Sequence, residues 1–119
     1  MKALLDHNVS EHLKALLPEH VVLAAKDRHR DGWDTLRNGA LLRAAEAEQF
    51  EVFVTGDKGI YYQQNNRTRL IALVVISTTK WEMVRSGAES ISSAISRATP
   101  GSFEYVILGS ESSEHELKR

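Results

Sequence analysis

Apolar runs alternate along the chain with amphipathic segments, and the two kinds of segment have different periods. Continuous or alternating apolar runs predict five strands, at residues 2–5, 21–24, 51–54, 70–76 and 103–107. Apolar positions at helical spacing predict helices between them, at residues 9–17, 38–49 and 88–98. Strands that alternate with helices are typical of an α/β fold, so the pattern predicts a central, mostly parallel five-stranded sheet.

The expected helices begin at residues that can cap a helix. Asn8 is expected to cap the first helix, with Glu11 three residues later as in a capping box, and Pro18 ends the apolar pattern. Asn38 or Asp34 is expected to cap the second helix. In both places a polar side chain would accept a hydrogen bond from a backbone N–H group that the helix leaves without a partner.

Three segments show no clear period. Residues 25–37 are polar and irregular, and residues 60–66 fit either a short helix or a loop. Residues 110–119 form a polar tail that we expect to be disordered. We therefore expect a single domain over residues 1–109, followed by this tail.

The composition narrows the classes of function. No apolar run approaches the roughly 20 residues that a membrane span requires, and the first apolar stretch ends at Asp6, too early for a signal peptide. We therefore expect a cytoplasmic protein with no membrane partner. The absence of cysteine excludes disulfides, zinc–thiolate sites and thiol catalysis. The net charge of -1 gives no global attraction to nucleic acid, so nucleic-acid binding would depend on a local basic cluster or a metal.

Two aspartates each follow an expected strand. Asp6 comes directly after the first strand, and Asp57 comes just after the third. In an open parallel sheet, ligands bind outside the carboxyl ends of the strands, at the topological switch point. Two carboxylates at that edge would suit a hard divalent cation and phosphodiester chemistry. The same two residues could equally be turn formers.

Three strings in the sequence resemble a known family. LLDHN at 4–8, GWDTLRNGALLRAAEAEQFEVFVTGDKG at 32–59 and YYQQNNR at 61–67 are together similar to the small bacterial PIN-like proteins related to VapC-type toxins. The resemblance covers residues 2–78. It implies a three-layer α/β fold and an Mg²⁺- or Mn²⁺-dependent ribonuclease that is the toxin component of a toxin–antitoxin system. It also implies a cluster of acidic residues at the carboxyl edge of the sheet.

Only part of that acidic cluster is present here. Asp6 matches the first-strand aspartate of the family, and Asp57 matches the aspartate of its T-x-D turn. Asn38 stands where many relatives have an acid, and Gly59 stands where a further acid often follows the turn. The resemblance thus implies that Asp6 and Asp57, with the neutral oxygen of Asn38, hold one Mg²⁺ or Mn²⁺ ion. The set is poor for two ions about 4 Å apart.

The expected partners are RNA, a cognate antitoxin protein and a second copy of the chain in a homodimer. Lys58, Arg67 and Arg69 would contact the RNA backbone. The polar and aromatic string at 61–67 could stack on single-stranded bases, pack a short helix against the sheet, or form a dimer surface. An apolar dimer surface could involve Trp33, Trp81 and Met83, unless these residues belong to the core.

Two other functions compete with the nuclease. A catalytically weakened PIN-like protein would act through protein–protein interaction, and the residues at Asn38 and Gly59 favour it. A receiver-like signalling domain would need adjacent acids after the first strand, and His7 follows Asp6 instead. We interpret His7 as a turn residue or a proton shuttle, and Glu46 as a solvated helix residue beside the apolar stripe.

Overall fold

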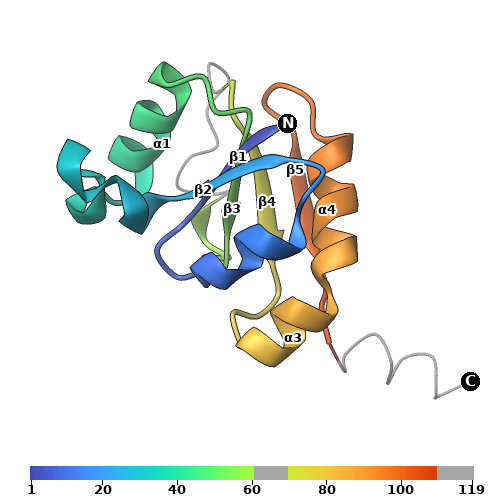
Figure 1. The fold of residues 1–119 in the computed structure, drawn as a ribbon. Helices are drawn as coiled ribbons and strands as arrows, with labels where there is room; N and C mark the ends of the chain where they lie inside the picture. Colours follow the sequence, from blue (N-terminus) through green and yellow to red (C-terminus); the bar gives the residue numbers. More distant parts are fainter. Residues whose placement is uncertain (61–69, 110–119) are drawn as a thin grey trace, which may run out of the picture.

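The structure, a computed structural model, describes residues 1–60 and 70–109 and is built on one parallel sheet (Figure 1). The expected α/β class and the five-stranded parallel sheet are confirmed. The strand order is β2-β1-β3-β4-β5. The strands are β1 (Lys2–Leu5), β2 (Val21–Ala24), β3 (Val52–Thr55), β4 (Ala72–Ile76) and β5 (Phe103–Val106).

The strand order reverses at β1. The chain runs from β1 to β2 on one side, and then crosses to β3 on the other side of β1. Leu4 pairs with Phe53 and Leu5 with Val54, so β1 and β3 end side by side. This order places a topological switch point at the carboxyl ends of β1 and β3.

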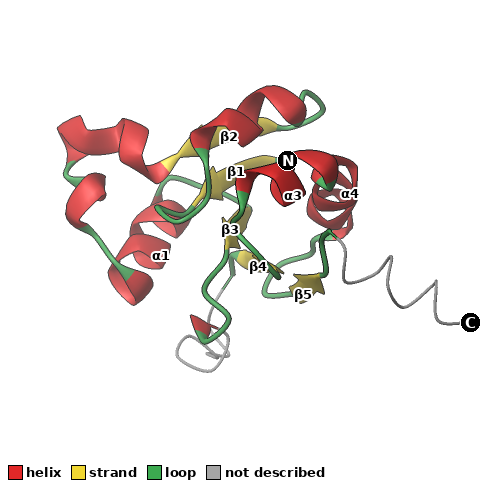
Figure 2. Ribbon diagram, turned by 90° about the horizontal axis from the view of Figure 1, so that it is seen from below, coloured by secondary structure: helices red, strands yellow, loops and turns green. Residues whose placement is uncertain are grey.

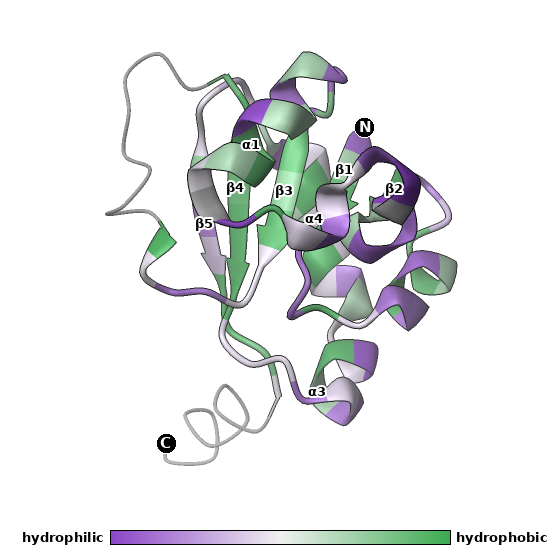
Figure 3. Cartoon of the chain, turned by 90° about the vertical axis from the view of Figure 1, so that its left-hand side faces the viewer, coloured by the Kyte–Doolittle hydropathy of each residue, from purple (hydrophilic) through white to green (hydrophobic). Residues whose placement is uncertain are grey.

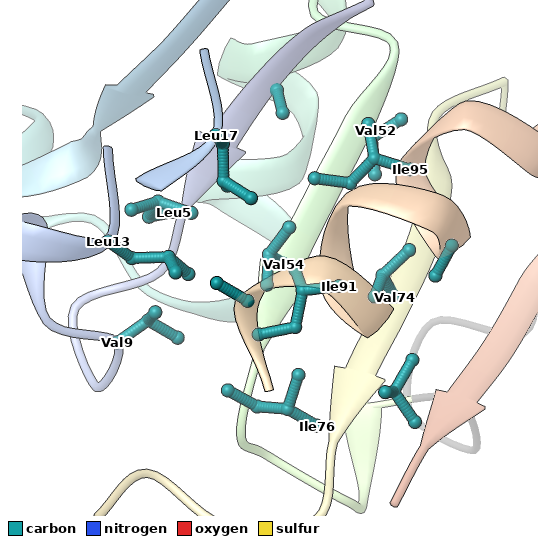
Figure 4. Close-up of a cluster of buried hydrophobic side chains, with 14 of the residues drawn as sticks. Leu5, Val9, Leu13, Leu17, Val52, Val54, Val74, Ile76, Ile91 and Ile95 are labelled. Atoms are coloured by element: carbon teal, nitrogen blue, oxygen red, sulfur yellow. The ribbon is translucent and has the colours of Figure 1, made fainter. Parts of the chain in front are cut away.

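One face of the sheet is covered by a short 3₁₀ helix, η1 (Glu11–Leu16), and by two α-helices, α3 (Trp81–Ser86) and α4 (Ala88–Arg97) (Figure 2). Alternate strand residues point into this layer, where they meet apolar side chains of η1 and α4 (Figure 4). Burial of each such Leu, Val or Ile side chain contributes about 1.5–3 kcal/mol. The labelled members of the cluster are Leu5, Val9, Leu13, Leu17, Val52, Val54, Val74, Ile76, Ile91 and Ile95.

The opposite face is covered by α1 (Asn38–Ala47) and by two 3₁₀ segments, η2 (Ala25–Asp31) and η3 (Trp33–Thr35). Residues of β3 and β4 are buried on both faces, which is why these strands are almost entirely apolar (Figure 3). The second cluster joins strand residues to α1 and η3: Leu4, Phe53, Leu73 and Val75 with Trp33, Leu41, Leu42, Ala45, Phe50, Ile60 and Ile71.

The first expected helix differs from the prediction in type and in cap. It is a 3₁₀ helix that begins after Ser10, whose hydroxyl accepts a hydrogen bond from the His12 N–H group at 3.2 Å. The prediction that Asn8 caps this helix is wrong, because the Asn8 Oδ1 atom accepts a hydrogen bond from the Gly56 N–H group at 3.1 Å. The side chain of Leu16, expected on the apolar face, is 38% exposed.

The remaining differences lie between the strands. The irregular stretch 25–37 contains η2 and η3, and α1 follows it with Arg37 at the N-cap position, so neither Asn38 nor Asp34 caps α1. Helix α3 was not predicted from the sequence. Residues 61–69 and 110–119 lie outside the described residues, so the predictions of a short helix or loop and of a disordered tail stay predictions. Within the described residues, no helix is long and apolar enough to cross a membrane.

Candidate metal centre

The two predicted aspartates lie next to each other at the switch point. Asp6 follows β1 directly, and its N–H group donates to the Val54 carbonyl at 2.9 Å, which continues the β1–β3 ladder by one bond. Asp57 lies two residues beyond the end of β3. Both side chains are half-buried. The parallel pairing of β1 with β3 is therefore what brings the two residues to one place.

Thr55, the last residue of β3, joins the two aspartates. Its hydroxyl donates to Asp6 Oδ2 at 2.6 Å and accepts from the Asp57 N–H group at 3.0 Å. The Thr55 residue is fully buried, so water does not compete for either bond. The donor and acceptor roles of one hydroxyl are both used, which fixes the Asp6 carboxylate relative to the backbone of Asp57.

This role of Thr55 was not predicted from the sequence, where the residue stands only as the first position of the T-x-D string. One signal was available, because Thr55 is a hydroxyl residue that ends an otherwise apolar strand. A hydroxyl in a buried strand position needs a hydrogen-bond partner, and a carboxylate at the same sheet edge is a suitable one.

Each aspartate also stabilises its own turn. Asp6 Oδ1 accepts from the His7 N–H group at 2.7 Å, and Asp57 Oδ1 accepts from the Gly59 N–H group at 2.9 Å. The interpretation of both residues as turn formers is thus confirmed. A carboxylate oxygen has more than one acceptor position, so these bonds leave ligand capacity on both side chains.

The turns after β1, β3 and β4 meet around Gly56. Besides its hydrogen bond to Asn8, Gly56 lies so close to the segment after β4 that a Cβ atom here would overlap the Thr79 methyl group. Thr79 is followed by the exposed Lys80, which precedes α3. The carboxyl edge is therefore a continuous surface formed by three adjacent strand ends, with one aspartate on each of the first two.

His7 links this edge to the segment that leads into α1. Its Nε2 atom lies 3.0 Å from the Leu36 carbonyl, which can only accept, so Nε2 carries the proton of this bond. The interpretation of His7 as a turn residue agrees with this contact. Asn38 is the first residue of α1, two positions after Leu36. The Asn38 side chain lies outside the described residues, so its role as a third ligand stays a prediction.

The structure places two of the other residues singled out in the sequence, Lys58 and Glu46. Lys58 is exposed at the tip of the turn beside Asp57, and Arg67 and Arg69 lie outside the described residues. The interpretation of Glu46 as a solvated residue is wrong. Its half-buried carboxylate accepts from the N–H groups of Leu70 at 2.7 Å and Ile71 at 3.0 Å, at the opposite, amino-terminal edge of the sheet.

Trp33 belongs to the core, with 6% of its surface exposed, so the dimer surface that could have involved it is not formed there. Its ring packs against Phe50, with ring centroids 6.0 Å apart, and the Arg28 guanidinium carbon lies 4.3 Å from the ring centroid. These contacts fix η3 onto the sheet face that α1 also covers.

In the described part of this edge, the acidic side chains that could meet a cation are those of Asp6 and Asp57, which are too few for two hard cations. Asp6 and Asp57 supply carboxylate oxygens, which Mg²⁺ and Mn²⁺ prefer, and Mg²⁺ is commonly held by one or two carboxylates together with water and substrate phosphate. Across residues 1–60 and 70–109, no three His, Asp or Glu side chains are grouped as metal ligands. Any further protein ligand would therefore have to be neutral or lie outside those ranges.

Comparisons of the chain with known protein families, with curated proteins and with solved structures gave no match.

Proposed function

We propose that this chain is a divalent-metal-dependent endoribonuclease of the PIN-like type, the toxin component of a toxin–antitoxin system. The observation that supports the proposal is the adjacency of Asp6 and Asp57 at the switch point between β1 and β3, with Thr55 hydrogen-bonded to both. Ligand sites of open parallel sheets are found at such a point. The sequence strings that resemble the PIN-like family include both aspartates.

In this proposal the residues have distinct roles. Asp6 and Asp57 hold Mg²⁺ or Mn²⁺, and the Thr55 hydroxyl holds the Asp6 carboxylate in a fixed orientation. The ion, when bound, supplies Lewis-acid activation of water and of the scissile phosphate. Lys58 and Lys80 are exposed after β3 and β4 and would contact the RNA backbone, which gives local positive charge on a chain of net charge -1. Arg67 and Arg69 are proposed for the same task.

The cellular setting follows from the resemblance alone. A cognate antitoxin protein would cover the carboxyl edge and keep RNA from it, and the protein would act in the cytoplasm. An antitoxin that blocks the site would need to meet the exposed turn at Lys58, which is the most accessible part of this edge among the residues around Asp57.

The first prediction concerns cleavage. Purified parent protein should cleave RNA with Mn²⁺ or Mg²⁺, and Asp6→Asn or Asp57→Asn should each reduce the rate by about 100-fold or more, since loss of even an outer-shell partner of a metal costs 10–100-fold. Asparagine keeps the size of each side chain and one acceptor oxygen, which can keep the turn bonds from the N–H groups of His7 and Gly59, although Asp6→Asn loses the acceptor of the Thr55 hydroxyl. Glu89→Gln, at an exposed position on α4, is the matched control and should cleave like the parent.

Two results would contradict the proposal. One is no cleavage by folded parent protein at millimolar metal. The other is equal cleavage by the parent and both aspartate variants, which would assign the activity to a contaminant or to another site. Folding of each variant is checked by circular dichroism.

A second function, a PIN-like protein that acts only through protein–protein interaction, is favoured by one observation. Within the described residues no third acidic or histidine side chain joins Asp6 and Asp57, and Gly59 occupies a position where the family often has an acid. Calorimetric titration with Mn²⁺ separates the two functions. The nuclease must bind the ion through Asp6 and Asp57, whereas an interaction module has no need to.

A further inference from the structure

The amino-terminal edge of the sheet, opposite the two aspartates, contains a cavity of about 320 Å³. Its wall is built from the start of β1, the end of α1, the residues that precede β3 and β4, and the connection from α4 to β5. Figure 1 shows the N-terminus, the end of α1 and the α4–β5 connection at the same end of the molecule. Small-molecule sites are concave and begin at about 300 Å³ in volume, so this cavity is large enough for a small organic compound.

Backbone hydrogen bonds hold the wall of the cavity in place. The Glu51 N–H group donates to the Lys2 carbonyl at 2.8 Å, which ties the residue before β3 to β1. The Gly101 N–H group donates to the Leu70 carbonyl at 2.9 Å, which ties the α4–β5 connection to the residues before β4. Gln49, with a φ of 67°, lies in the left-handed region and reverses the chain after α1. The wall is therefore preorganised by the fold itself.

The described residues of the wall are mostly apolar, and no basic side chain is among them. The charged members are two acids, Glu46 and Glu51. A wall of this composition is complementary to a ligand that combines an apolar body with a positive charge. The apolar wall residues are Met1, Phe50, Leu70, Ala98 and Pro100.

Both carboxylates can still accept hydrogen bonds from a ligand. The Glu46 Oε2 atom accepts from the N–H groups of Leu70 and Ile71. The Glu51 Oε1 atom accepts from the Lys2 N–H group at 2.9 Å. A carboxylate has about four acceptor positions on its two oxygens, so these bonds fix the two groups and leave positions for a ligand. An ammonium group taken out of water needs such acceptors, because an unpaired buried charge is costly.

The charges next to the cavity favour a ligand with one positive charge. The Lys2 Nζ atom donates to the Glu48 carbonyl at 2.8 Å and lies 4.5 Å from the centroid of the Phe50 ring. The Glu48 carboxylate is itself paired with Arg28, at 3.5 Å. The Lys2 ammonium offsets one of the two carboxylates of the wall, so one further cation balances the other.

We propose that this cavity binds a small organic monocation, a primary ammonium group on an apolar body. The ammonium group is held by Glu46 and Glu51, and the apolar body packs against Phe50 and Leu70. An anion such as a nucleotide is disfavoured there, because it would meet two carboxylates. The proposal does not depend on the proposed nuclease function, since the cavity and the two aspartates lie at opposite edges of the sheet.

Phenethylamine, which is protonated at pH 7, is the probe for this site. Its titration into the ¹⁵N-labelled chain should shift the amide resonances of Gln49, Glu51 and Thr99 of the wall, with a Kd of about 1 mM or below. 2-Phenylethanol has the same apolar body and no charge. It should bind at least about tenfold more weakly, because hydrogen bonds between charged groups are the stronger ones. The anion 3-phenylpropionate should bind more weakly still.

Substitution of one wall acid tests the position of the ammonium group. Glu51→Gln keeps an acceptor oxygen for the Lys2 N–H group and removes the charge, so it should weaken phenethylamine binding by about tenfold. Glu51 is exposed, so the circular dichroism spectrum should stay that of the parent. Glu89→Gln, exposed on α4 and outside the cavity wall, is the matched control and should leave the Kd unchanged.

Four results would each overturn the proposal. The first is no amide shift at about 10 mM phenethylamine, and the second is equally tight binding of 2-phenylethanol. The third is an equal Kd for the parent and Glu51→Gln. The fourth is a set of shifts confined to the residues around Asp6 and Asp57, where the amine would meet the other pair of carboxylates.

Discussion

At the residue scale, single side chains tie loops to both edges of the sheet. At the carboxyl edge, Thr55 contacts Asp6 across 49 positions of sequence. At the amino edge, the Glu46 carboxylate holds the backbone of Leu70 and Ile71, 24 and 25 positions away. The local sequence around an acidic residue beside an apolar helix stripe is the same whether its carboxylate faces solvent or accepts hydrogen bonds from backbone N–H groups far along the chain. That is why the role of Glu46 was not predicted.

Substitution of Glu46 should therefore affect stability. Glu46→Ala removes two hydrogen bonds to a carboxylate, one of them to a partly buried N–H group, and should lower the free energy of unfolding by about 1–3 kcal/mol. Glu46→Gln keeps an acceptor oxygen and should lose less. Urea denaturation followed by circular dichroism measures both. Equal midpoints for parent and Glu46→Ala would show that the contact contributes nothing to stability.

At the element scale, the strands were predicted to within two residues, because each is an apolar run with polar or turn residues on both sides. A helix was also predicted where η1 lies, but η2 and η3 were not predicted, because these short segments show no helical period. For η1 the local sequence pattern predicted Asn8 as the cap, with Glu11 three residues later. In the structure Ser10 is the cap, and the Asn8 side chain instead accepts a hydrogen bond from the N–H group of Gly56, just after β3. Local sequence cannot contain that competing partner.

The elements η1 and η2 are joined by an ion pair between Lys14 and Asp27, 2.5 Å apart. The hydrogen bond from Lys14 holds the pKa of the Asp27 carboxyl below its usual value of 3.8, although partial burial opposes the shift. The lowered pKa means that the pair stabilises the fold at pH above about 4, and that this contribution is lost as the pH falls through the pKa of the folded state.

Lys14→Met should raise the pKa of Asp27 toward 3.8, as measured by NMR titration of its carboxyl carbon. Both side chains are about one third exposed, so the loss of stability at pH 7 should be below about 1 kcal/mol, and it should become smaller as the pH falls below 3.8. Lys26→Met, at an exposed position of η2 itself, is the control and should leave the pKa of Asp27 closer to the parent value. An unchanged pKa in Lys14→Met would contradict the assigned cause.

At the scale of the whole molecule, the sequence predicted that Asp6 and Asp57 lie at the same edge of the sheet. It did not predict that they follow neighbouring strands. Adjacency depends on the strand order, which is set by pairings such as Ala3 with Val22 and Ala3 with Val52. Apolar runs carry no information about which strand pairs with which. The position of the candidate metal centre between β1 and β3 therefore had to come from the structure.

The sheet also couples the two cores. Leu4 points into the cluster below α1 and Leu5 into the cluster below α4, since successive strand residues face opposite sides. Unfolding either helical layer exposes strands that the other layer needs as its support. We therefore expect one cooperative transition, as is usual for domains under about 150 residues.

The two tryptophans lie on opposite faces of the sheet, so the unfolding of each face can be followed separately. Trp33 lies in the cluster on the α1 side, and Trp81 packs against the cluster on the α4 side. Trp81→Phe leaves Trp33 as the only indole, and Trp33→Phe leaves Trp81. In each variant, the urea midpoint from tryptophan fluorescence should coincide with the midpoint from far-ultraviolet circular dichroism. Protein concentration must be equal throughout, because self-association would shift both midpoints. A fluorescence transition of Trp33 that precedes the circular dichroism transition would show that the α1 layer unfolds on its own.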